Sequence, residues 1–352
     1  MLIALTCLQL FAFEQPTVVK EFQSTNLGEP LSFPCSMHFS PDGKLFLADF
    51  NNHKIYVWNK DGSFLKTFGE EGQGPGELHQ PTKVTATDKL VYVWDQSRVV
   101  KVFDHEGNPK QTIKLAGYWP RNFAVLNPNL LLLGYNKYIS GTEIKACFSL
   151  VDATGQEIEM LQEYDNEATL DGEVAPNTAH IKAYMPDVDI QKAENGNYIF
   201  GFSQTKELFE IDANGKIVNA LTHKLPAAAP SDRDREIFEN VPVPSPEGFK
   251  PLKEIKTLHV NYSFPKAYYT HILMRDGKAV YITTPLGGME FRGNGYFLGQ
   301  YYVTDFKTGK VLSRGEYEYP EHSMVLYRDG RVLLAYSGEE DFSIKEIRLK
   351  GM

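Results

Sequence analysis

The sequence is poor in cysteine, in clustered basic residues and in long apolar segments. Only three cysteines occur among 352 residues, and the formal net charge is −9. Affinity for nucleic acids comes mainly from clustered Lys and Arg side chains that contact phosphates. This charge balance therefore excludes a nucleic acid as the partner.

Familiar motifs of enzyme sites are missing as well. The chain contains no Gly-Lys-Ser or Gly-Lys-Thr, no His-Glu-x-x-His, no Cys-x-x-Cys and no Gly-x-Ser-x-Gly sequence. These motifs mark phosphate binding, metal binding and serine nucleophiles. No two carboxylates can be paired for acid–base catalysis from the sequence either. The sequence thus favours a binding protein over an enzyme.

The N-terminus carries a short apolar run, MLIALTCLQLFAF. It has the length of a signal-peptide core and is too short to cross a bilayer as a helix. We expect residues 1–15 to be a signal or anchor segment, and the protein to be exported to the periplasm or the cell surface. Because no Lys or Arg precedes the run, its start could be truncated. A lipid anchor on Cys7 and a buried strand stay open as alternatives.

A glycine-rich stretch, TFGEEGQGPGELHQP (residues 67–81), raises the question of a phosphate cradle. Such a cradle needs a strand before the glycines and a helix after them. The following residues, TKVTATDKLVYVWDQ, have the pattern of short strands and lack an apolar helical face. We therefore expect a connector between two structural units, with glycines at positive φ.

Turn signals recur in pairs along the chain, and each pair indicates a four-stranded antiparallel unit. The pairs are Asp42-Gly43 with Asp61-Gly62, Asp88-Lys89 with Glu106-Gly107, Asn127 to Asn129 with Thr154-Gly155, Asn195-Gly196 with Asn214-Gly215, and Asp276-Gly277 with Thr308-Gly309, while Asp329-Gly330 opens a sixth unit. Units of about 40 residues or more with this pattern are typical of propeller blades. Cys35 and Cys147 fall in different units, so we expect free thiols.

The two ends of the chain predict how the ring closes. The sixth unit ends after its third strand, FSIKEIRLK, whereas an unassigned strand, TVVKEFQS (Thr17 to Ser24), lies near the N-terminus. If this strand completes the last blade, no open edge remains. We predict an all-β fold: a single six-bladed propeller over residues 16–352, monomeric, closed by its N-terminal strand.

One part of the chain resembles a known repeat. FGEEGQGPGELHQPTKVTATDKLVYVWDQSRVVKVFDHEG is similar to an NHL repeat, with its glycine-rich approach, a proline that opens the innermost strand and an aspartate that ends the next. The whole chain resembles bacterial exported six-bladed propellers of the NHL and TolB-like type. Related propellers include peptidyl-hydroxyglycine lyases and gluconolactonase-like enzymes, which bind zinc or calcium on the channel axis.

Polar residues near the start of the innermost strands are the candidates for ligand contacts, because these strands line the channel and its mouth. The candidates are His38, Lys83, Arg121, Asn122, Asp187, Asp189, His271 and His322. Aspartates at other strand ends are expected to bind turn amides instead; these are Asp49, Asp95, Asp104 and Asp152.

Three of the candidates are histidines that could form a metal site. If His38, His271 and His322 converge with an acidic partner, they could hold zinc or calcium with an open position for water. They precede the aspartate of the next turn by four, five and seven residues. Strand alternation therefore need not point all three inward. Histidines satisfied by neighbouring backbone groups are the alternative, and no cofactor is firmly predicted.

Two insertions interrupt the blade pattern, at about residues 226–264 and 285–300. Long excursions of this kind are often lids or binding surfaces. Ser231 is a candidate N-cap for one short helix in the first insertion. Phe291 and Arg292 in the second stand among glycines and suit a ligand contact.

These observations leave two functions. The first is a non-catalytic, exported binding or scaffolding propeller that recognises a peptide, glycan or protein partner at the channel mouth. The second, implied by the family resemblance, is a metal-assisted lyase or lactonase with its active site on the axis. An RNA-binding NHL propeller does not fit the charge.

Overall fold

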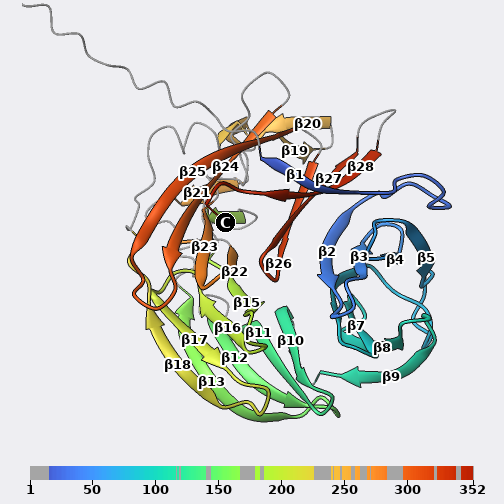
Figure 1. Cartoon of the computed structure of the whole chain (residues 1–352), viewed down its shortest axis with the longest axis horizontal. Coiled ribbons are helices and arrows are strands. Elements are labelled where there is room, and N and C mark those ends of the chain that lie inside the picture. Colours follow the sequence, from blue (N-terminus) through green and yellow to red (C-terminus); the bar gives the residue numbers. More distant parts are fainter. Residues whose placement is uncertain are drawn as a thin grey trace, which may run out of the picture.

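The computed structural model describes residues 16–115, 117–118, 120–139, 144–166, 179–182, 186–225, 239–240, 242–245, 248–254, 258–261, 268–269, 271–283, 296–320, 323–337 and 342–351. They form a ring of four-stranded antiparallel sheets (Figure 1). The predicted six-bladed, all-β propeller is therefore confirmed.

Each blade is a meander whose first strand borders the axis. Blade one contains β2 (Pro34–Phe39), β3 (Leu45–Asp49), β4 (Lys54–Trp58) and β5 (Phe64–Phe68). Blade two contains β6 (Pro81–Ala86), β7 (Leu90–Asp95), β8 (Val99–Asp104) and β9 (Pro109–Lys114). Blade three contains β10 (Pro120–Asn127), β11 (Leu130–Tyr138), β12 (Ile144–Asp152) and β13 (Glu157–Asn166).

The second half of the ring repeats this order. Blade four contains β15 (Val188–Lys192), β16 (Tyr198–Phe202), β17 (Glu207–Ile211) and β18 (Ile217–Thr222). Blade five contains β22 (His271–Arg275), β23 (Lys278–Thr283), β24 (Tyr296–Asp305) and β25 (Val311–Pro320). Blade six contains β26 (Ser323–Arg328), β27 (Arg331–Ser337), β28 (Phe342–Arg348) and the N-terminal β1 (Thr17–Phe22).

Strand β1 closes the ring, as the sequence predicts. It pairs antiparallel with β28, from Thr17 opposite Arg348 to Phe22 opposite Ile344. The next residue ties this strand to blade one, because the backbone N–H of Gln23 donates to the carbonyl of Gly62 (2.8 Å). The two ends of the chain thus complete one blade, and the outer edge of β28 is covered.

The core of the described chain lies between the blades rather than at the axis. Six clusters of buried apolar side chains each join two neighbouring blades, including the pair formed by blades six and one. Strands such as β3 are therefore buried on both faces. This explains why they are continuously apolar and do not alternate.

The glycine-rich stretch is a connector between β5 and β6. Gly69 has a φ of 89°, as expected for a chain reversal. The buried Lys101 holds the loop by donating from Nζ to the carbonyls of Gly74 (3.1 Å) and Glu77 (2.6 Å). Its charge is compensated by Asp95, 3.4 Å away. The connector is thus fixed by a lysine of blade two, the blade that it leads into.

Short additional elements occur between blades. β14 (Ala179–Lys182) pairs in parallel with β21 (Leu258–Asn261), β19 (Pro242–Ser245) pairs with β20 (Gly248–Pro251), and η1 (Leu252–Glu254) is a single 3-10 turn. The helix expected after Ser231 and most of the second insertion lie outside the described residues. Cys35 and Cys147 are free thiols, as expected, and Cys7 is outside the described part.

Candidate functional site

The axis has two chemically different ends. The inner strands β2, β6, β10, β15, β22 and β26 border it, and neighbouring inner strands lie next to each other. Each connector from an outer strand leads to the first residue of the next inner strand. The mouth is the end of the axis where the inner strands begin. The far end is the opposite end, where the inner strands finish.

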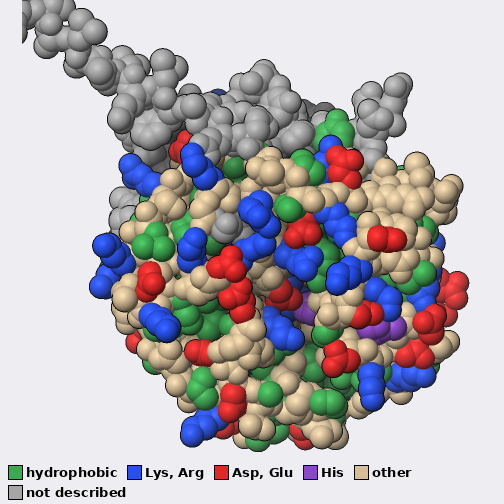
Figure 2. Space-filling model, viewed as in Figure 1, with side chains coloured by type: hydrophobic (Ala, Val, Ile, Leu, Met, Phe, Trp, Pro, Cys, Tyr) green, Lys and Arg blue, Asp and Glu red, His purple; other side chains and the backbone are tan. Residues whose placement is uncertain are grey.

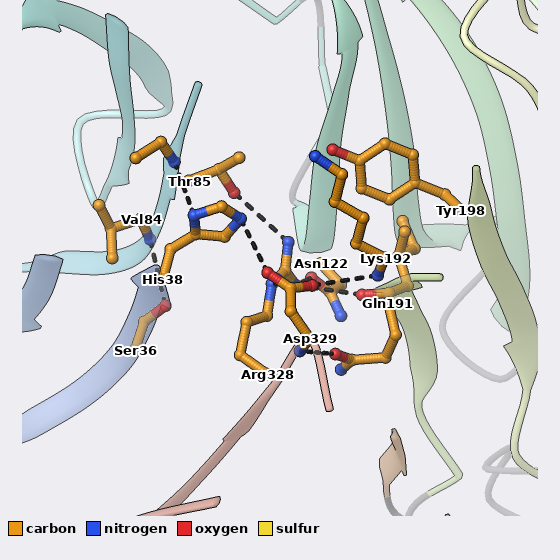
Figure 3. A network of polar contacts seen from close by, with 12 residues as sticks. Ser36, His38, Val84, Thr85, Asn122, Gln191, Lys192, Tyr198, Arg328 and Asp329 are labelled. Carbon is orange, nitrogen blue, oxygen red and sulfur yellow. Dashed lines mark hydrogen bonds and ion pairs between the residues drawn. The ribbon is translucent and has the colours of Figure 1, made fainter. Parts of the chain in front are cut away.

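Arg328, the last residue of β26, reaches across the axis into three other blades (Figure 3). Its Nη1 donates to Oδ1 of Asn122 (3.1 Å) and to the carbonyl of Ile190 (3.1 Å). Its Nη2 donates to the carbonyl of Phe123 (3.2 Å) and to Oγ1 of Thr85 (3.4 Å). The flat, permanently charged guanidinium suits several acceptors at once. It therefore connects blade six to blades two, three and four.

Asp329 follows in the tight turn and binds blades one and four (Figure 3). Its Oδ2 lies 2.9 Å from Nε2 of His38, and its Oδ1 accepts the backbone N–H of Lys192 (3.0 Å). Its own N–H donates to Oε1 of Gln191 (3.0 Å). Burial favours a raised pKa for Asp329, but His38 and the neighbouring guanidinium outweigh it and hold the pKa well below its usual range.

His38 is neutral in this arrangement. Its Nδ1 accepts the backbone N–H of Ala86 (3.1 Å), so the ring proton sits on Nε2 and faces Asp329. Burial lowers the pKa of His38, and the nearby carboxylate offsets this only in part. This histidine is thus satisfied by backbone and carboxylate, the alternative that the sequence left open.

Asp189 extends the network to the remaining blade. Its Oδ1 accepts from the side-chain amides of Asn122 (3.0 Å) and Gln191 (3.0 Å). Its Oδ2 accepts the backbone N–H of Ile272 in blade five (2.7 Å). One buried polar network therefore touches all six blades. Its side chains are bonded to one another, and all except Asp329, which is 15% exposed, are buried. The network therefore closes the axis structurally, from the ends of β2 and β26 to the early residues of β10 and β15.

The mouth carries charged groups that are more accessible. Arg121 in β10 forms a bidentate pair with Asp187, which precedes β15, at 3.1 and 3.0 Å. The carboxylate of Asp187 raises the pKa of Arg121 above its usual value. Lys83 in β6 and His271 at the start of β22 are half-buried. Figure 2 shows acidic, basic and histidine side chains gathered around the centre of the ring.

Lys83 and His271 are close enough to affect each other electrostatically. Burial lowers the pKa of Lys83, and Asp187 partly offsets this effect. Burial also lowers the pKa of His271, while Asp189 raises it and Lys83 lowers it further. Within the part of the chain that the structure describes, neither side chain forms a hydrogen bond or an ion pair.

Most of the predicted candidates lie at the axis, but His38 does not lie near the start of its strand. It is the fifth of six residues in β2, at the far end. The reason is turn length: Phe39 pairs with Leu45 across five residues, whereas Arg275 pairs with Lys278 across two. A similar offset from the Asp-Gly signal therefore places His38 and His271 at different depths.

The metal hypothesis stays a prediction. Among the described residues, no group of three His, Cys, Asp or Glu side chains is placed to hold a metal ion. His38 contacts Asp329, and His271 stacks on Tyr327 with 4.9 Å between ring centroids. His322, Phe291 and Arg292 lie outside the described residues.

Arg328 and Asp329 were not predicted as site residues. The sequence marks them only as part of a turn, and the same Arg-Asp-Gly sequence occurs at Arg275. Both turns place the aspartate at positive φ, 50° for Asp276 and 48° for Asp329. Arg275 instead donates to the carbonyl of Gly330 (3.4 Å) beside the turn of blade six. The local sequence gives no signal that separates the two arginines.

The aspartates at strand ends bind backbone amides, as expected. Asp49 Oδ1 accepts from the N–H of Asn52 in its own turn (3.1 Å) and Oδ2 from that of Ser32 (2.7 Å). Asp95 similarly accepts from Ser97 (3.0 Å) and His79 (3.0 Å). Asp104 and Asp152 bind amides within their own turns.

Comparison with known proteins supports the fold. Residues 38–184 match a family described as 6-bladed beta-propeller. A candidate exported protein from Bacteroides fragilis superposes with a TM-score of 0.58 at 14% identity, over 97% of each chain. A DUF4221 family member from Bacteroides vulgatus gives 0.52 at 11% identity, over 97% of this chain and 98% of that one.

More distant similarity adds nothing to this. Virginiamycin B lyase from Staphylococcus aureus gives a TM-score of 0.44 at 15% identity, over 94% of this chain and 99% of that one. No curated protein matches the sequence. In the described part, no helix is long and apolar enough to cross a membrane.

Proposed function

We propose that this chain is an exported, non-catalytic propeller of the NHL and TolB-like type that binds a peptide, glycan or protein partner at its mouth. The supporting observation is the contrast between the two ends of the axis. At the far end, Arg328 and Asp329 are bonded to their surroundings. At the mouth, Lys83 and His271 form no hydrogen bond or ion pair with other described residues. Enclosed polar groups without partners are typical of ligand sites.

The backbone at the mouth adds a second argument. β14 lies in the connector that leads into β15, and β21 lies in the connector that leads into β22. Connectors of this kind run over the mouth side, and these two pair in parallel. Functional loops held on a rigid scaffold are the usual place for recognition. The two paired strands thus link the connectors that lead into blades four and five.

Export is supported by the apolar N-terminal run and by the name of the Bacteroides fragilis neighbour. The lyase or lactonase alternative needs converging metal ligands. No arrangement among the described residues favours it.

A ligand screen, followed by a variant in which one charge at the mouth is reversed, would test the binding role. We would probe the immobilised protein with a glycan array and a phage-displayed peptide library. Hits would then be measured with Arg121→Glu and with the matched control Lys114→Glu. Arg121 is 44% exposed at the mouth, whereas Lys114 is exposed on the outer strand β9.

We expect Arg121→Glu to weaken a true ligand at least about tenfold, which is the effect of one lost charged contact. Lys114→Glu should bind like the unmodified protein. Hits that bind both variants equally well would place recognition elsewhere and refute the proposal.

A further inference from the structure

Two phenylalanine side chains form an exposed aromatic pair on the mouth side of blade one, at the right of Figure 1. Phe33 directly precedes β2 and is 43% exposed, and Phe50 directly follows β3 and is half-buried. Their ring centroids lie 5.8 Å apart at an interplanar angle of 71°, so the edge of one ring contacts the face of the other. This packing covers at most one face of each ring and leaves an aromatic surface in contact with water.

The backbone holds this aromatic pair in place. The N–H of Phe33 donates to Oδ1 of Asp49 (3.1 Å), and the N–H of Ser32 donates to Oδ2 (2.7 Å). The N–H of Phe50 donates to the carbonyl of Phe33 (2.9 Å). The carboxylate that anchors both segments is fully buried. A ligand that packs on the pair therefore meets a preformed surface and has little of the chain to order.

Uncharged polar groups border the aromatic pair. Ser32 and Asn51 are both exposed, and Nδ2 of Asn51 donates to Oγ of Ser32 (3.1 Å). This bond uses one of the two amide hydrogens of Asn51, and the Ser32 hydroxyl keeps its own hydrogen as a donor. The border thus offers donors and acceptors that carry no formal charge.

The charges near the pair disfavour an ionic ligand. The buried carboxylate of Asp49 lies beneath it and opposes an anion, while the backbone of Ser32 and Phe33 covers both carboxylate oxygens. In the two segments that build the surface, 29–33 and 49–54, the other acidic and basic side chains are Glu29 and Lys54, and these form an ion pair with each other. A neutral ligand therefore matches this part of the mouth best.

We propose that the aromatic pair, with Ser32 and Asn51, binds a neutral sugar ring of a glycan. This inference rests on the proposed function and deepens it, because it names the ligand class and the part of the mouth that recognises it. One face of a sugar ring carries C–H groups, which the negative face of the Phe33 ring attracts. The hydroxyl groups of a sugar both donate and accept, as do a serine hydroxyl and a side-chain amide.

The size of the aromatic pair favours a sugar over a protein surface. A specific protein interface covers about 800 Å² on each partner, whereas each aromatic side chain supplies about 200 Å² even when it is fully used. One sugar ring matches the smaller area. A proline-rich peptide is the nearest rival, because such peptides also dock on exposed aromatic rings.

The test is an NMR titration of the full chain with the methyl glycosides of D-glucose, D-galactose, D-mannose and N-acetyl-D-glucosamine. Neutral oligosaccharides that bind in the glycan array are titrated as well. Sorbitol is the control ligand, because it has the hydroxyl groups and lacks the ring, and hexaproline represents the rival. Phe33→Ala removes the exposed ring, and Phe33→Trp enlarges it. Leu65→Ala is the matched control, because Leu65 is also 43% exposed and belongs to the outer strand β5 of the same blade.

We expect at least one neutral saccharide to bind saturably and sorbitol not to bind. Phe33→Ala should weaken binding about tenfold, the effect of one lost aromatic contact, whereas Phe33→Trp and Leu65→Ala should bind at least as well as the unmodified protein. If Phe33→Ala does not fold, Asn51→Ala decides, with an expected loss of about threefold for one neutral hydrogen bond. Equal binding by the Phe33→Ala or, in that case, the Asn51→Ala variant, binding of hexaproline in place of sugars, or no saturable binding of any neutral saccharide would overturn the inference.

Measurement of Arg121→Glu in parallel separates this inference from the proposed function. A ligand of any class that is weakened by Arg121→Glu and binds Phe33→Ala normally would refute the sugar site and leave the binding role at the mouth intact. A saccharide that is weakened by Phe33→Ala alone would support the sugar site and count against a contribution of Arg121.

Discussion

Replacement of Phe22 by Ala should reveal how much the ring depends on its N-terminal strand. Phe22 is 3% exposed and is the last residue of β1. Its ring lies 6.1 Å from that of Phe39 and 6.4 Å from that of Trp58, both in blade one. The side chain therefore belongs to the cluster that joins blades six and one. Loss of a buried Phe costs about 3 to 5 kcal/mol, from lost transfer energy and the remaining cavity.

The matched control lies on the same strand. Val18 is 46% exposed, so Val18→Ala should change the free energy of unfolding by no more than about 0.5 kcal/mol. Urea unfolding followed by tryptophan fluorescence measures both variants, since Trp58 contacts Phe22. Removal of residues 17–24 should lower the melting temperature further, because the edge of β28 is then exposed. If Phe22→Ala lowers the free energy of unfolding by less than about 1 kcal/mol, the packing of β1 does not hold the ring closed.

Three further predictions concern the network, a histidine and a turn. Arg328→Met should lower the free energy of unfolding by about 3 to 5 kcal/mol and broaden the urea transition, because buried charges and carbonyls lose their partner. The control Arg348→Met, at an exposed position, should change the free energy of unfolding by no more than about 0.5 kcal/mol. Burial lowers the pKa of His223 to about 4, so below pH 6.5 the unfolded state binds a proton that the native state does not yet bind. The free energy of unfolding should therefore fall by about 3 kcal/mol between pH 6.5 and pH 4. An equal fall in a His223→Gln variant would contradict this. Gly155→Ala should destabilise the protein by more than about 1 kcal/mol, because its φ is 91° and a Cβ would lie 2.0 Å from the carbonyl oxygen of Lys114. Gly196 has a similar φ of 89° but no atom within 4 Å of a Cβ. Thermal melts of Gly196→Ala therefore measure the backbone strain alone.

The blade pattern could be predicted because its signals are local. An Asp-Gly or Asn-Gly turn works through the φ of one or two residues, and Gly43, Gly107 and Gly215 all have positive φ. Ring closure could be predicted for a related reason: an incomplete last unit and a spare first strand complement each other. Neither step requires knowledge of distant contacts.

The candidate site could be predicted only in part. Lys83, Arg121 and His271 follow from strand order, because a polar residue at the start of an inner strand lies at the mouth. His38 was misplaced because the turn after β2 is longer than the turn after β22. Arg328 escaped prediction because its partners lie 138 to 243 residues away. Contacts across the axis leave no periodicity in the sequence.

The polar network on the axis should make the six blades unfold cooperatively. In an open array each unit contacts only its neighbours, so stability is a sum of local terms. Here Arg328 in blade six bonds to blades two, three and four, and Asp329 reaches His38 in blade one. The bonds of Arg328 join blades that share no apolar cluster. Breaking any one blade therefore removes acceptors or donors from several others, and the ring should unfold as a unit. The same rigidity would hold the strands that carry Lys83 and His271 at a fixed separation, which a ligand site at the mouth requires.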